Sequence, residues 1–154
     1  MKKFLCLLLI SPLLFVSCSD NDDDFPNVKV KIETTGATIV DGVIYVVQGD
    51  LFSIDDITVV TSDANSQVVI GSASFYWDRM FVGSTTIAPF NFIIDTYTEA
   101  VGRHLLQVRC SLLAVDYSPV VGVIKCPVKI VASIDDVPQG SESTQMLVYP
   151  DIDD

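Results

Sequence analysis

The sequence predicts an all-β fold, an antiparallel β-sandwich of about seven to nine strands that occupies residues 28–132. This part of the chain is rich in Val, Ile, Thr and aromatic residues, which favour extended strands. Apolar and polar residues alternate over short runs, and no run keeps the 3.6-residue period of a helix. Turn-forming residues separate these runs. A segment of ~100 residues can build one core but is too short for two domains.

Alternation and turn residues define the first half of the predicted strands. Residues 28–32 alternate apolar and basic side chains, as a half-buried strand does. Asp41-Gly42 lies between two apolar runs and predicts a type I′ hairpin turn. Asp55-Asp56 interrupts the next apolar run, which predicts a bulge or a bend. The strands predicted in this half are 28–32, 38–40, 43–47, 51–54, 57–61 and 68–70.

The second half contains the longest strands and most of the aromatic core. The strands predicted here are 72–80, 90–96, 105–115 and 121–131. In the first of them Ala73, Phe75 and Trp77 share one face, because side chains alternate across a strand. We therefore expect Trp77 between the two sheets. The aromatic residues expected in the core are Phe75, Trp77, Phe81, Phe90 and Phe92.

The chain becomes polar and acidic after Ala132. Because residues 133–154 are poor in core-forming side chains, we expect an acidic C-terminal tail that is peripheral to the sandwich. An apolar stretch at residues 146–149 leaves an alternative, in which it docks as an extra strand.

Net charge is −11 for the whole chain, and the acidic residues concentrate at its two ends. Without residues 1–17, seven basic and twenty acidic side chains leave −13. Residues 25–132 carry ten acidic and seven basic side chains, so the sandwich itself is close to neutral. Nucleic-acid binding demands a strongly basic domain, so this distribution argues against nucleic acid as a partner.

The N-terminus has the order of a secretory signal. Lys2 and Lys3 precede an apolar run at residues 4–16, and Ser17-Cys18 and an acidic run at residues 19–24 follow it. The apolar run is shorter than the ~20 residues of a membrane-spanning helix, and Pro12 interrupts it. These features predict a cleaved signal peptide at residues 1–17.

Residues 15–18, Phe-Val-Ser-Cys, resemble a bacterial lipobox, with Phe15 where Leu is more usual. The resemblance implies lipidation at Cys18, and several acyl chains on one cysteine give stable anchoring. The acidic run resembles the export signal of surface lipoproteins in the Bacteroidota. It implies a lipid-anchored protein of the outer membrane, displayed on the cell surface, with residues 18–27 as an acidic tether. The alternatives are an incidental thiol at Cys18 and a plain solvated tether.

Two segments of the predicted sandwich resemble an immunoglobulin-like or PKD-like domain. Residues 75–78, Phe-Tyr-Trp-Asp, are similar to its third strand with the core tryptophan, and residues 102–110 to its sixth. The resemblance covers residues 28–132 and implies an Ig-like sandwich in the broad sense. Antibody-type domains have a disulfide between strands B and F, whereas no cysteine lies between Cys18 and Cys110 here. Val108 also takes the place of the tyrosine-corner residue.

The two longest strands predict a hairpin that opposes Cys110 and Cys126. If the turn in residues 116–120 centres on Ser118, opposed residue numbers sum to 236, as those of the two cysteines do. Opposed residues in an antiparallel pair lie ~4.5–5.5 Å apart between Cα atoms, which is within reach of a disulfide. An exported protein meets an oxidising compartment. The alternative is two buried thiols that pack as small apolar groups.

The sequence predicts no catalytic, cofactor-binding or metal site, and the protein is not expected to be an enzyme. His104 is the single histidine, and no nucleophile motif accompanies it. Zinc-ligand spacings and glycine-rich phosphate loops do not occur. For calcium, Asp50 with Asp55-Asp56, or Asp135-Asp136, offer oxygen atoms but match no EF-hand loop. Such aspartates are typical turn formers.

Two classes of function remain. The first is a binding or accessory module at the cell surface, in glycan or nutrient capture, with Tyr76, Tyr97 and Tyr117 as residues that stack on sugars. We also expect one outer face to contain Arg109, Lys125 and Lys129, which suits an acidic glycan or simply faces solvent. The second is a structural or assembly component of an adhesive or envelope complex, joined through an open sheet edge.

Overall fold

The computed structural model describes residues 25–61, 67–139 and 145–150. The predicted lipidation site Cys18 and the signal peptide lie outside the described residues, so both stay predictions. The described part is all-β, as the sequence predicts, with one 3₁₀ helix, η1 (Ile134–Asp136). Its strands are β1 (Val28–Thr35), β2 (Thr38–Val40), β3 (Val43–Val47), β4 (Leu51–Thr61), β5 (Val68–Trp77), β6 (Met80–Thr85), β7 (Phe92–Asp95), β8 (Gly102–Ala114), β9 (Val120–Val131) and β10 (Gln145–Pro150).

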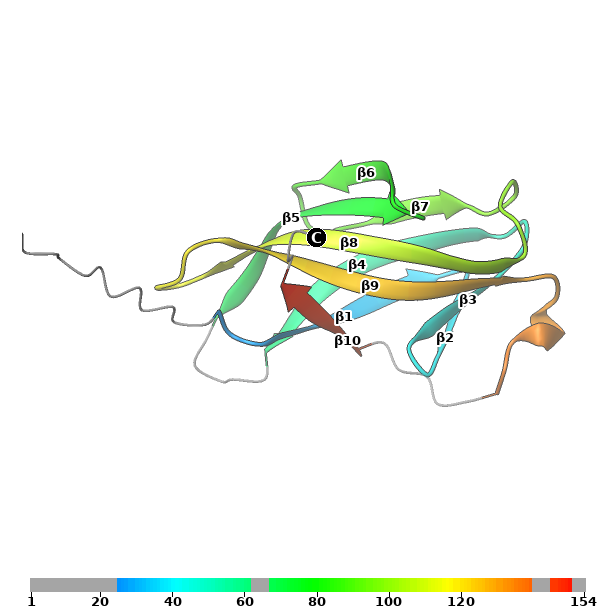
Figure 1. Cartoon of the computed structure of the whole chain (residues 1–154), viewed down its shortest axis with the longest axis horizontal. Coiled ribbons are helices and arrows are strands. Elements are labelled where there is room, and N and C mark those ends of the chain that lie inside the picture. The colour runs from blue at the N-terminus through cyan, green and yellow to red at the C-terminus, as the bar shows by residue number, and fades with distance from the viewer. Residues whose placement is uncertain (1–24, 62–66, 140–144, 151–154) are drawn as a thin grey trace, which may run out of the picture.

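The strands form two layers that face each other across a core (Figure 1). The larger layer has the order β6-β5-β8-β9-β3-β2, and the smaller has the order β1-β4-β7. Pairing is antiparallel except between β3 and β9, which run parallel. The predicted antiparallel sandwich is therefore confirmed in its layers and corrected at this one pair.

β10 joins the two layers at one side of the sandwich (Figure 1). Its first half pairs with β1, with Lys29 opposite Leu147, and its second half pairs with β9, with Ile124 opposite Val148. This segment therefore docks as an extra strand, which was the alternative to a wholly peripheral tail. An apolar stretch in an acidic tail can still pair its backbone with two strands whose edges would otherwise be open.

The core lies between the layers and draws on both. The smaller sheet contributes buried residues such as Ile32 and Phe52, and the larger contributes Phe75 and Leu106. Trp77 is 7% exposed and belongs to the core, as predicted. Phe81 is 59% exposed, so the prediction that it is buried is wrong. It lies on β6 and packs on the ring of Tyr76 from outside the sheet. The inward-facing residues of the two longest strands are Leu106, Val108, Cys110, Leu112, Ile124, Cys126, Val128 and Ile130.

Two turns with left-handed residues shape the hairpins. Asp41 and Gly42 have φ of 50° and 77°, which confirms the predicted turn between β2 and β3. Asp78 and Arg79 have φ of 46° and 73°, and they divide the predicted strand 72–80 into the end of β5 and the start of β6. At the predicted bulge, Glu33 pairs with Asp56 and Thr34 with Ile54, so Asp55 is the extra residue.

The register of β8 and β9 differs from the predicted one. Cys110 lies opposite Gly122, and Cys126 lies opposite Leu106. The turn comes earlier than predicted, because the backbone N–H of Tyr117 donates to the carbonyl of Ala114 and Asp116 takes a left-handed φ of 69°. The two cysteines share the inner face but stand four residues apart along the ladder. They are thiols, and the predicted disulfide is wrong.

Within the described ranges, no helix has both the length and the apolar character needed to cross a bilayer.

Candidate functional site

Four exposed cations from two neighbouring strands define the outer face of the larger sheet, which we call the cationic face. They are Arg103 and Arg109 of β8, and Lys125 and Lys129 of β9. The structure brings Arg109, Lys125 and Lys129 to one face, as the sequence predicts. Arg103 was missed because the strand was expected to begin at residue 105, whereas β8 begins at Gly102.

Strand alternation places these cations outside because the apolar residues between them fill the core. Arg103 lies directly opposite Lys129, and Gln107 lies opposite Lys125. Arg109 is two residues beyond Gln107, so it is a diagonal neighbour of Lys125 across the pair. The face therefore has two groups of cations, Arg103 with Lys129 near the Gly102 end of the β8–β9 ladder, and Arg109 with Lys125 near its middle.

Each group includes a tyrosine from an adjacent strand. The guanidinium carbon of Arg109 lies 5.1 Å from the centre of the Tyr76 ring on β5. The ammonium of Lys129 lies 5.8 Å from the centre of the Tyr45 ring on β3. Such cation–π contacts orient long side chains across the sheet without cancelling their charge. Tyr76, which the sequence suggested as a residue that stacks on sugars, is half-buried and contacts Arg109 and Phe81.

The charge on this face is not balanced by its own strands. The sequences of β2, β3, β5, β6, β8 and β9, all within the described chain, contain neither Asp nor Glu. Like charges directly opposed in a ladder are destabilising, so the pairing of Arg103 with Lys129 is not explained by the stability of the sheet. These six strands therefore contribute positive charge and no carboxylate to the face.

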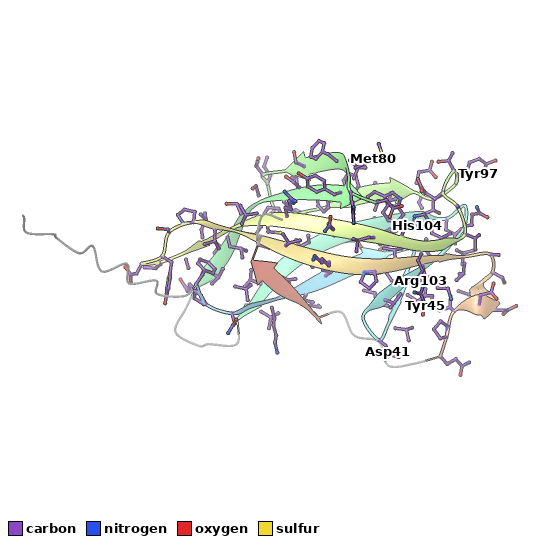
Figure 2. The ribbon with its side chains drawn as sticks, in the orientation of Figure 1. Asp41, Tyr45, Met80, Tyr97, Arg103 and His104 are labelled. Atoms are coloured by element: carbon purple, nitrogen blue, oxygen red, sulfur yellow. The ribbon has the colours of Figure 1, made fainter. Side chains whose placement is uncertain are left out.

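A second polar group surrounds His104, which is labelled in Figure 2, and lies where β5 ends and β8 begins. Nδ1 of His104 lies 2.7 Å from Oδ2 of Asp78 and 4.0 Å from Oε2 of Glu99. Nε2 of His104 lies 2.8 Å from the carbonyl oxygen of Ala100. The indole N–H of Trp77 donates to Oε2 of Glu99 at 3.1 Å, and the indole ring stacks on the imidazole. We call Asp78, Glu99 and His104 the histidine cluster.

The surroundings of His104 favour its charged form. Burial alone would lower the pKa of His104, but the hydrogen bonds to Ala100 and Asp78, together with the charges of Asp78 and Glu99, raise it above its ordinary value. Nδ1 faces the carboxylate of Asp78 and Nε2 faces the carbonyl oxygen of Ala100, and both of these groups accept hydrogen bonds. Sequence reasoning missed Asp78 and Glu99, because the two-residue turn that contains Asp78 has no glycine to mark it.

The other residues singled out in the sequence do not form a site together. Tyr97 is 76% exposed in the loop after β7. Tyr117 instead packs edge-on against Phe25, with the ring centres 5.7 Å apart. Asp55 accepts hydrogen bonds from the hydroxyls of Ser53 and Thr35, which lower its pKa.

Asp56 and Asp136 each accept hydrogen bonds from backbone N–H groups. Asp56 accepts from the backbone N–H groups of Ile57 and Phe90. Asp136 accepts from the backbone N–H of Ser133, and the Ser133 hydroxyl accepts from the N–H of Asp135, which forms a capping box on η1. Asp55 and Asp56 thus lie at the bulge of β4, and Asp136 caps η1.

A third feature is the open edge of the larger sheet at β6. Met80, Phe81 and Val82 are 73%, 59% and 42% exposed on this strand. β6 lies beside β7, the edge of the smaller sheet (Figure 1). A Cβ atom added at Gly83 would come within 2.6 Å of the Phe92 ring, so the two edges are packed closely here.

Comparison with known proteins adds a structural likeness. No family model and no curated protein matches the chain. Among solved structures, the fibronectin(III)-like modules of Clostridium thermocellum CbhA are similar, with a TM-score of 0.41 and 20% sequence identity. The match covers 68% of this chain and 98% of that one.

Proposed function

We propose that this protein is a binding module that presents its cationic face to an acidic polysaccharide. The observation that carries the proposal is the set of four cations on strands that contain no acidic residue. Arg103 and Arg109 stand six residues apart on one strand, which is ~20 Å at the usual rise. A ligand that meets both groups of cations is therefore extended, as a carboxylated or sulfated sugar chain is. The aromatic rings of Tyr45 and Tyr76 lie next to Lys129 and Arg109, respectively.

The same proposal includes the anchor predicted from the sequence. Lipid on Cys18 would hold the module at the outer membrane, on the cell surface, and the acidic residues 19–24 would keep it away from an anionic membrane. Nine residues separate Cys18 from β1, which span up to ~30 Å when extended. No catalytic step forms part of the proposal.

A direct binding measurement tests the ligand class. We expect polygalacturonate and heparin to bind the full chain, with an affinity that falls as salt is added, and neutral dextran not to bind. The double substitution Lys125→Gln and Lys129→Gln is expected to weaken binding ~5–30-fold, since it removes two charge contacts. The control, Lys29→Gln with Lys31→Gln, changes the net charge equally on β1 and should bind as the parent does.

Two outcomes would contradict the proposal. If both double variants weaken binding equally, only net charge matters and the face is no site. If duplex DNA binds as tightly as the acidic polysaccharides, the face selects polyanions in general, and a glycan is not its specific ligand.

A second candidate function, assembly of an envelope complex, is favoured by the open edge at β6. The strand has exposed apolar side chains and no charged residue, so two copies can pair edge to edge without repulsion. Here the partner is a second copy of the chain. Sedimentation analysis should then show a dimer that Val82→Lys converts to a monomer, while a monomeric parent rejects this candidate.

A further inference from the structure

Two carboxylates of the histidine cluster face a single imidazole nitrogen. Oδ2 of Asp78 is within hydrogen-bonding distance of Nδ1, at 2.7 Å, whereas Oε2 of Glu99 is 4.0 Å away. A proton on Nδ1 is therefore donated to Asp78. The carboxylate of Glu99 instead accepts a hydrogen bond from the indole N–H of Trp77. A single proton on Nδ1 therefore neutralises only part of the negative charge of the two carboxylates.

The orientation of His104 is fixed from its other side. Nε2 lies 2.8 Å from the Ala100 carbonyl oxygen, which can only accept, so Nε2 carries a hydrogen in every protonation state. In the neutral ring, the lone pair of Nδ1 then points at the Asp78 carboxylate. A lone pair and a carboxylate oxygen at 2.7 Å need a cation between them, either a proton or a metal ion.

We propose that Asp78, Glu99 and His104 bind a divalent transition-metal ion of the zinc class in place of that proton. One ligand atom from each residue lies within 4.8 Å of the others. Tetrahedral zinc with bonds of ~2.0–2.2 Å places its ligand atoms ~3.3–3.5 Å apart. The two separations from Nδ1, 2.7 and 4.0 Å, lie on either side of that value, so carboxylate shifts of less than ~1 Å are enough.

The ligand set suits zinc better than calcium. An imidazole nitrogen with two carboxylates is typical of zinc, whereas calcium takes six to eight oxygen atoms. The side chain of His104 is 10% exposed, while those of Asp78 and Glu99 are 47% and 30% exposed. The ion would therefore be reached from solvent past the carboxylates, and water would complete its coordination.

Contacts outside the ligand set already hold each ligand. Metal-binding histidines usually donate their other ring N–H to a carbonyl or a carboxylate, as His104 does to Ala100. Oδ1 of Asp78 accepts from the backbone N–H of Leu105 at 2.8 Å. The backbone carbonyl of Glu99 accepts from the side-chain amide of Gln48. Such support is what a site needs to keep its geometry.

The test uses the chain's single tryptophan, Trp77, as a reporter, because its ring stacks on His104. We expect Co²⁺ to quench the fluorescence of the full chain, kept reduced, in a saturable one-to-one titration, and Zn²⁺ to reverse it. Zn²⁺ should also raise the melting temperature, since an ion that binds only the folded state stabilises it. Asp78→Asn and His104→Gln should weaken binding more than ~10-fold.

The control is Asp41→Asn, the same change at the same position of the other two-residue turn, and it should bind as the parent does. Quenching that does not saturate, or that is unchanged in Asp78→Asn and His104→Gln, overturns the proposal. So does an intense cobalt–thiolate absorption band, which would place the ion on cysteine. If a variant fails to fold without metal by circular dichroism, Glu99→Gln replaces it, with the same expected loss. The proposal is independent of the cationic face.

Discussion

The indole ring of Trp77 stacks on the imidazole ring of His104, with ring centres 5.1 Å apart and planes 19° apart. One face of this indole thus lies on the histidine cluster, while the residue itself is 7% exposed in the core. Its N–H reaches Glu99 on the loop between β7 and β8. Trp77 therefore connects the packing of the sandwich with the polar contacts at its end.

We expect Trp77→Ala to lower the free energy of unfolding by ~3–5 kcal/mol, because a large buried side chain and its packing are lost. Trp77→Phe should cost less, since it keeps a ring in the core and loses the hydrogen bond to Glu99. Urea unfolding followed by circular dichroism measures both. Tyr97→Ala is the control, because Tyr97 is 76% exposed. A Trp77→Ala protein as stable as this control would contradict the core assignment.

The pairing of β10 with two strands predicts that it contributes to stability. Val148→Pro removes a backbone donor from the segment that pairs with β9, and we expect a fall in melting temperature of several degrees. Gln139→Pro, at an exposed position outside any strand, is the matched control. Equal melting temperatures for both variants would mean that the tail adds nothing to the sandwich.

Short-range signals in the sequence were enough for most strands of this fold. Asp41-Gly42 marks its turn because glycine takes a left-handed φ at no cost. Asp78-Arg79 makes the same kind of turn without glycine, so the end of β5 at Trp77 was not visible in the sequence. The parallel pairing of β3 with β9 is a long-range contact, and local alternation contains no information about it.

Register and clusters were harder to predict for a similar reason. The turn before β9 uses Asp116 in a left-handed conformation, which no pattern distinguishes from a turn centred on Ser118. Asp78, Glu99 and His104 have no motif spacing, and they meet only because the β5–β6 turn and the loop before β8 lie at the same end. Three of the four residues of the cationic face, Arg109, Lys125 and Lys129, were predictable because they follow from alternation alone.

The close approach of β6 and β7 gives a prediction at Gly83. A Cβ atom there would lie 2.6 Å from Cε2 of Phe92, whose ring stacks on Phe75 at 4.6 Å and cannot move freely. Gly83→Ala should therefore destabilise the protein by ~1–3 kcal/mol, as overpacking does. Ser84→Ala, next to it and exposed, should have little effect. Urea unfolding measures the stability of the two variants. Equal midpoints would contradict the close packing of Gly83 against Phe92.

Cys110 and Cys126 are buried thiols. Burial raises the pKa of each to about 12, from an ordinary value of 9.0. The thiolate is the reactive form, so we expect iodoacetamide at pH 8 to modify neither residue in the folded protein. After denaturation without reductant, peptide mass spectrometry should find both alkylated. A pair of peptides joined by a disulfide would contradict the register of β8 and β9.

The same pKa shifts make stability depend on alkaline pH. Below pH 9 both the folded and the unfolded chain keep these thiol protons, so the stabilisation is fully present. Between pH 9 and 12 the unfolded chain releases them and the folded chain does not, so the free energy of unfolding falls as pH rises, by ~1 kcal/mol per thiol and pH unit. Urea unfolding at pH 8, 9 and 10 measures this slope. The double variant Cys110→Ala and Cys126→Ala keeps every other titrating group, and it should lose stability more slowly than the parent over this range. Equal slopes in the two proteins would show that the thiols ionise in the folded state and are not buried as described.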